Sequence, residues 1–119
     1  MVLEKKFVTE ETKLTLALDG RFAFCEVFVN GAPVKKLMFD RTCDLSGFLK
    51  KGENTLTLRL INGNRNLLGP FHVKNDPEPF GVGPYTFDRY KTWNGSESPT
   101  YRHSYSFVKF GIDKIELYK

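Results

Sequence analysis

The 119-residue sequence has little of what marks a metal site, a membrane protein or many enzymes. It contains two cysteines, two histidines and one tryptophan. No apolar run approaches the roughly 20 residues that a membrane span needs. A GxSxG nucleophile elbow, an HExxH zinc motif and a phosphate-binding glycine loop are all absent. These gaps exclude the enzyme classes that such motifs define.

The charges also exclude one class of partner. The formal net charge is +4, but lysines and arginines are scattered among fourteen acidic residues. Neither an arginine-rich stripe nor an aromatic RNA-binding motif is present, so nucleic acid is not an expected partner. The first residues, MVLEKKF, lack the apolar core of a signal peptide. Both ends are strand-like, which indicates a domain taken from a longer polypeptide, and the cellular compartment stays open.

The two cysteines, Cys25 and Cys43, leave two alternatives. They could form a disulfide, which sequence alone does not show. An isolated pair in a domain of this size is more often two buried thiols, and we favour that interpretation.

What the sequence has in quantity is alternation of apolar and polar residues. Leu14, Leu16 and Leu18 alternate with polar or small residues, as in a half-buried strand. The same pattern predicts about seven strands, over residues 2–8, 13–19, 24–29, 34–39, 55–61, 104–110 and 112–118. No segment shows a sustained helical period. The prediction is one all-β domain over residues 1–119, an antiparallel β-sandwich or jelly roll.

Three short segments between these strands predict turns. Asn30-Gly31 indicates a type I′ hairpin, because both central residues of that turn need positive φ. Residues 44–49 predict a turn or a single helical turn, and residues 51–54 predict a further turn.

One long segment, residues 62–102, interrupts the alternation. Five of the six prolines and seven aromatic residues, including the tryptophan, lie between residues 62 and 101. Loops of this length are uncommon in compact domains and are usually functional or disordered. Large apolar rings argue against disorder, so we expect an ordered insertion packed by its own side chains.

Several strings resemble a known family. CEVFVNGAPV, CDLSGFLKKGENTLTLRL and the closing FGIDKIELY resemble galactose-binding-like β-sandwich domains attached to bacterial glycoside hydrolases. Family 2 β-glycosidases and α-L-rhamnosidase-type enzymes look most similar. RNLLGPFH and PFGVGPYTF resemble an insertion in C-terminal sandwich domains of large bacterial glycosidases. The resemblance implies a non-catalytic accessory domain, and it also raises a structural Ca²⁺, for which Asp40, Asp44 and Asp113 offer oxygen ligands without a recognisable spacing.

The residues themselves give no catalytic frame. A glycosidase needs two carboxylates at a defined separation across a sugar, and Asp76, Glu78, Asp88 and Glu97 lie in loop sequence. Cys25 with His72 or His103 would be a nucleophile and base, but Cys25 lies among apolar residues of a strand. We therefore expect no catalytic residues and no cofactor.

Carbohydrate binding is the activity that the residues best support. Aromatic rings stack on sugar faces, and planar or charged groups bond to hydroxyls. The candidates are Trp93, Tyr90, Tyr85, Tyr101, Arg65, Asn66 and His72, with Arg102 and His103 as further donors. The alternative is a purely structural or protein-interaction module, in which these side chains hold the insertion on the sandwich. In either case we expect Leu67, Leu68 and Pro70 to form a hydrophobic anchor.

Overall fold

The computed structural model describes residues 1–69, 71–72, 103–105 and 107–119. The chain divides into two compact units, Met1–Asn62 with Phe110–Lys119 as the first and Gly63–Lys109 as the second. Residues 63–102 of the predicted insertion belong to the second unit. Residues 73–102 lie outside the described ranges, so the prediction that they form an ordered lobe stays a prediction, as does the single domain over residues 1–119.

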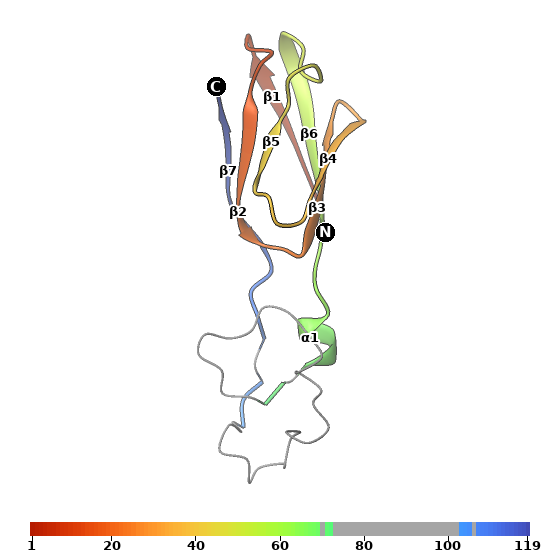
Figure 1. Ribbon diagram of the computed structural model, residues 1–119, viewed down its shortest axis with the longest axis vertical. Helices are drawn as coiled ribbons and strands as arrows, with labels where there is room; N and C mark the ends of the chain where they lie inside the picture. The colour runs from red at the N-terminus through yellow and green to blue at the C-terminus, as the bar shows by residue number, and fades with distance from the viewer. Residues whose placement is uncertain (70, 73–102, 106) are drawn as a thin grey trace. The chain divides into compact units, whose positions relative to one another are not determined.

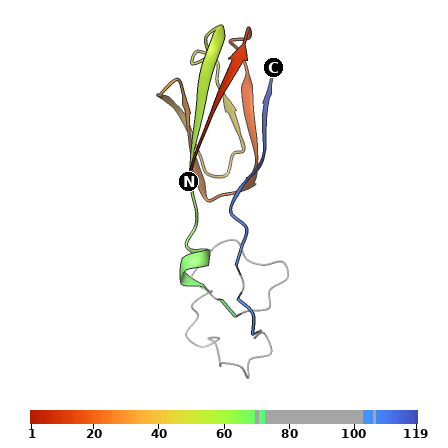
Figure 2. The same ribbon diagram turned by 180° about the vertical axis from the view of Figure 1, so that it is seen from behind.

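The first unit is an antiparallel β-sandwich, which confirms the predicted fold class (Figures 1 and 2). One sheet has the strand order β1-β6-β3-β4, and the other has the order β5-β2-β7. The four-stranded sheet consists of β1 (Val2–Thr9), β6 (Gly52–Ile61), β3 (Phe24–Val29) and β4 (Ala32–Leu37). The three-stranded sheet consists of β5 (Thr42–Asp44), β2 (Thr15–Arg21) and β7 (Gly111–Tyr118).

Alternating apolar residues from both sheets form the core. On β6, Leu56, Leu58 and Leu60 are buried, and Thr57 and Arg59 between them are not. The other sheet contributes Leu16 and Leu18, and β3 contributes Cys25, Val27 and Val29. Full burial of such a side chain is worth about 1.5–3 kcal/mol. The predicted inward positions of these strands are therefore confirmed.

The hairpin between β3 and β4 has the predicted turn. Asn30 has φ 52° and Gly31 has φ 81°, and Val29 pairs with Ala32 across the two-residue loop. The side chain of Asn30 accepts a bond from the Thr55 N–H at 3.0 Å. It also donates to the buried Asn54 Oδ1 at 2.9 Å. The motif VNG thus fixes the turn and joins it to the start of β6.

Asn54 closes the neighbouring loop from inside. Its Nδ2 donates to the carbonyl oxygens of Lys50 and Gly52, and its Oδ1 accepts the Lys50 N–H. A buried amide with this many partners satisfies backbone groups that no strand reaches. The asparagine of the GEN string therefore has a structural role.

Gly20 lies where the β2–β7 pairing is interrupted by an extra residue, Asp113, on β7. The register shifts between Asp19 and Gly20. A Cβ at Gly20 would lie 2.4 Å from the Gly111 carbonyl oxygen, so no larger residue fits without moving the backbone. The close approach of these two strands requires this glycine.

Four sequence predictions differ from the structure. The described residues of 104–110 form no strand, and at Val108 both backbone groups bond to the Asn66 side chain instead. Residues 51–54 do not form a turn, since β6 begins at Gly52 and pairs there with Thr9. The three-residue strand β5 and the helix α1 (Arg65–Leu68) are too short to produce a periodic signal. The turn at residues 44–49 is confirmed, with the Ser46 N–H bonded to Asp44 Oδ1 at 2.8 Å.

Within the described ranges, no helix has the length and apolar character that crossing a bilayer requires.

Candidate functional site

In the described part of the second unit, the Asn66 side chain links two short segments of the chain. Asn66, on α1, donates from Nδ2 to the Val108 carbonyl oxygen at 2.8 Å. Its Oδ1 accepts the Val108 N–H, also at 2.8 Å. The amide thus bonds to Val108 as a neighbouring strand would. This pair of bonds holds residues 65–72 beside residues 103–109.

Beyond this joint, three aromatic rings form a cluster. The ring centroids of Phe71 and Tyr105 are 5.9 Å apart, and those of Phe71 and Phe107 are 6.1 Å apart. Tyr105 and Phe107 are stacked, with centroids 5.8 Å apart and an interplanar angle of 6°. The His72 ring lies 4.5 Å from that of Tyr105. We call these four residues the aromatic cluster.

The cluster is open to solvent on part of its surface. Tyr105 is 60% exposed and Phe107 is 58% exposed, while Phe71 and His72 are half-buried. Tyr105 and Phe107 are two residues apart in the sequence, and their rings lie side by side. Exposed aromatic rings beside an imidazole offer an apolar surface and a hydrogen-bonding edge together.

Four of the predicted site residues and further donors lie in this part of the unit. Arg65 is fully buried, Asn66 is half-buried and bonded to Val108, and His72 belongs to the aromatic cluster. His103 is exposed. The remaining predicted residues fall outside the described ranges: Tyr85, Tyr90, Trp93, Tyr101 and Arg102.

Sequence reasoning missed three members of the aromatic cluster and misplaced two leucines. Phe71, Tyr105 and Phe107 were not among the candidates, although the two-residue spacing of Tyr105 and Phe107 is visible in the sequence. Leu67, Leu68 and Pro70 were expected to anchor the insertion. The structure leaves both leucines exposed, and Pro70 lies outside the described ranges. On α1 the buried side chain is that of Arg65.

Both cysteines are free and buried, which confirms the interpretation favoured above. Burial raises the pKa of the Cys25 thiol to about 11, and burial likewise raises the pKa of the Cys43 thiol. The thiolate is the reactive form of cysteine. Cys25 is therefore in a poor environment for a nucleophile at neutral pH.

The acidic residues considered for Ca²⁺ have other partners where they are described. Asp40 pairs with Lys35 at 3.0 Å. Asp44 accepts a hydrogen bond from Ser46, which lowers the pKa of its carboxyl. Within the ranges that the structure describes, no three or more His, Cys, Asp or Glu side chains gather as a metal site.

Comparison with known proteins gives one structural match. No protein-family model matches the chain, and no curated protein matches it significantly. Among solved structures, a β-D-mannosidase from Dictyoglomus thermophilum is similar at 21% sequence identity with a TM-score of 0.46. The match covers 73% of this chain and 13% of that one. The chain therefore spans only a small part of the length of the protein it resembles.

Proposed function

We propose that this chain is a non-catalytic accessory domain of a bacterial glycoside hydrolase and that it binds carbohydrate weakly. The class rests on the resemblance of the VNG hairpin and the GEN string to sandwich domains of such enzymes. The binding rests on one observation, the exposed aromatic cluster of Phe71, His72, Tyr105 and Phe107.

The cluster suits the chemistry of a sugar. The C–H face of a pyranose packs on an exposed aromatic ring, and Tyr105 and Phe107 supply two such rings with nearly parallel planes. A tyrosine hydroxyl and an imidazole, the polar groups of Tyr105 and His72, are of the chemical kind that bonds to sugar hydroxyls. An accessory domain of this kind would hold the parent enzyme near its glycan or line the rim of the catalytic site.

Affinity gels loaded with plant and host glycans test the binding. The wild-type chain is expected to be retarded by at least one glycan, and Tyr105→Ala should weaken that binding about tenfold, the loss of roughly one ring contact. Tyr118→Ala is the matched control, because Tyr118 is an exposed tyrosine of the first unit. Trp93→Ala and Tyr90→Ala extend the test to the residues predicted from the sequence. If no glycan retards the wild-type chain, carbohydrate binding is wrong.

The absence of catalysis has its own test. The isolated chain should leave chromogenic aryl glycosides intact at any pH between 4 and 8, on the reasoning that it has no recognisable carboxylate pair. Hydrolysis that survives purification to homogeneity would contradict the non-catalytic assignment.

One observation favours the alternative, a module that packs against a catalytic domain. Phe39 is 92% exposed, and Met38 next to it is also exposed. An exposed large apolar pair in the first unit is suited to contact with another protein surface. Sedimentation at rising concentration tests this function: self-association abolished by Phe39→Ser, in a chain that binds no glycan, would favour it.

A further inference from the structure

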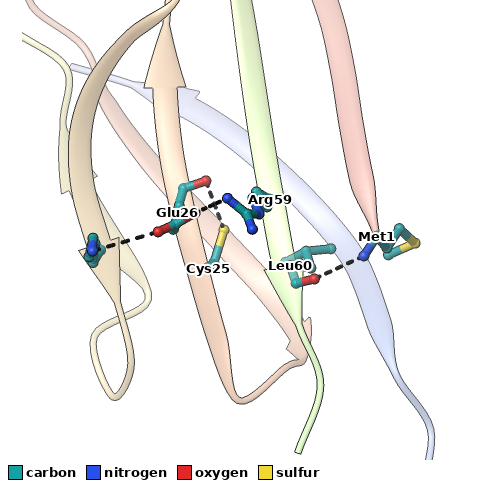
Figure 3. Close-up of polar contacts among 6 residues, drawn as sticks. Met1, Cys25, Glu26, Arg59 and Leu60 are labelled. Carbon is teal, nitrogen blue, oxygen red and sulfur yellow. Dashed lines mark hydrogen bonds and ion pairs between the residues drawn. The ribbon is translucent and has the colours of Figure 1, made fainter.

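The four-stranded sheet of the first unit has a row of three charged side chains that the proposed function does not use. Glu26, on β3, lies beside Arg59 on β6 (Figure 3). On the other side of β3 it pairs with Lys36 on β4. Its carboxylate is 3.2 Å from Arg59 Nη1 and 3.7 Å from Lys36 Nζ. The Glu26 side chain is only 17% exposed, whereas both cations are largely exposed.

Aromatic side chains flank this row. Side chains alternate along a strand, so Phe24, Glu26 and Phe28 share the face opposite to the core residues of β3. Lys36 Nζ lies 5.9 Å from the centroid of the Phe24 ring. Phe28 follows Glu26 on the same face of β3, and it pairs with Pro33 on β4. A charged group therefore lies between two apolar rings along about 13 Å of the strand.

A depression of about 230 Å³ opens beside this row. Its lining includes both polar and apolar groups of β3 and β4: Glu26, Val27, Phe28, Pro33, Val34, Lys35 and Lys36. The β3–β4 register shifts between Val27 and Phe28, so a bulge shapes the depression. Bulges commonly re-aim side chains beside binding sites. Pockets for drug-sized ligands have volumes of about 300–1,000 Å³. The volume of this depression therefore suits a ligand smaller than those.

The charges of the same sheet face balance. Lys6 pairs with Glu53 at 3.5 Å, and Thr57 donates to Glu4 at 3.4 Å. Together with the row, these residues give three cations and three carboxylates. A balanced face gives no long-range attraction for a polyanion, which favours a neutral ligand that bonds to donors and acceptors alike.

We propose that this depression binds one unit of a neutral sugar. The Glu26 carboxylate accepts bonds from sugar hydroxyls, Lys36 donates a bond to a hydroxyl oxygen, and Phe28 with Pro33 provides an apolar floor. Arg59 neutralises Glu26 from the opposite side, which lowers the cost of keeping the carboxylate largely covered. This site is separate from the aromatic cluster and does not depend on binding there.

Amide chemical-shift mapping on the full 119-residue chain tests the proposal. The probes are the methyl β-pyranosides of glucose, galactose and mannose. Glucuronate is the negatively charged sugar used for comparison. Shifts that saturate at Glu26, Phe28, Val34 and Lys36 are the expected result for at least one neutral glycoside. Shifts confined to residues 71–72 and 103–109 would overturn this proposal and leave the aromatic cluster as the binding site.

Three variants separate binding from a general effect on the sheet. Lys36→Ala and Glu26→Gln should each weaken the neutral glycoside about tenfold, the usual effect of losing a hydrogen bond to a charged group. Lys6→Ala is the matched control, since it removes an exposed, ion-paired lysine from the same face outside the depression. It should leave the affinity within about twofold.

Glu26→Gln also distinguishes the charge of the ligand. The substitution leaves Arg59 and Lys36 without their anion, so an acidic sugar would bind more tightly and a neutral sugar more weakly. Tighter binding of glucuronate to Glu26→Gln, without neutral binding by the wild type, would overturn the proposal. So would the absence of any saturable shift on β3 and β4, the result expected if this face serves a protein partner.

Discussion

The two units of this chain are held by different kinds of interaction. In the first unit, apolar residues from both sheets, mostly leucines and valines, fill a shared core. In the described part of the second unit, the contacts that join two short segments include the bonds of the Asn66 amide and several ring contacts. Burial of apolar area is the larger source of stability, and a single neutral hydrogen bond adds about 0.5–1.5 kcal/mol. Rigidity is therefore expected to differ between the two.

An asparagine substitutes for backbone partners in both units, which makes the comparison direct. Asn54 is buried and bonds to Lys50, Gly52 and Asn30 within the sandwich. Asn66 is half-buried and bonds to both backbone groups of Val108. The same kind of side-chain bond to the backbone is thus buried in one unit and only half-buried in the other. We therefore expect the Asn54 bonds to contribute more to the free energy of unfolding than the Asn66 bonds.

The largest effect is expected from the sandwich core. Leu58→Ala should lower the free energy of unfolding by about 2–5 kcal/mol, because Leu58 is buried on a central strand and its removal leaves a cavity. Urea denaturation followed by far-ultraviolet circular dichroism measures the change.

The control for this substitution is Val8→Ala on β1. Val8 is an exposed strand residue, so its truncation should change stability by less than about 0.5 kcal/mol. Equal effects of Leu58→Ala and Val8→Ala would contradict the inward and outward assignment of the four-stranded sheet.

The two asparagines should differ in how far their effect reaches. Asn54→Ala leaves buried backbone groups without partners and should lower the global free energy of unfolding by about 1–3 kcal/mol. Asn66→Ala should leave the global value nearly unchanged and speed hydrogen exchange of the Val108 amide by roughly tenfold or more. Denaturation and native-state exchange on both variants give the two readouts. A global loss from Asn66→Ala as large as that from Asn54→Ala would show that the units are stabilised alike.

The same contrast explains what the sequence could predict. Leu56, Leu58 and Leu60 face inward because strand geometry leaves every second residue on one face, and Asn30-Gly31 forms the turn because few other residues adopt positive φ. No such rule applies to Tyr105 and Phe107. Their spacing predicted a strand, but the backbone of Val108 bonds to the Asn66 side chain, 42 residues away in the sequence. Contacts of this kind depend on the tertiary fold, so the aromatic cluster was not foreseen as a site.

The depression beside Glu26 escaped prediction for a related reason. Glu26 looked like an ordinary outward residue of an alternating strand, and Lys36 and Arg59 lie on strands that only pairing brings beside it. The bulge that shapes the depression has no marker in the sequence except Pro33, which cannot donate to a strand partner. The pairing of β3 with β4 and β6 brings these residues together, and the alternation within a single strand could not indicate that.

The smallest expected effect concerns the thiol inside the sandwich. Burial raises the pKa of Cys25 from its ordinary value of 9.0 to about 11. The folded state therefore keeps this proton at pH values where the unfolded state has lost it, so the stabilising contribution is complete below pH 9 and is lost as the pH rises toward 11. The difference in unfolding free energy between wild type and Cys25→Ala should shrink by about 1 kcal/mol between pH 8 and pH 10, while the lysines common to both proteins cancel. Urea titrations of both proteins at each pH measure it, and a difference that stays constant or grows would show that Cys25 is not sealed in the core.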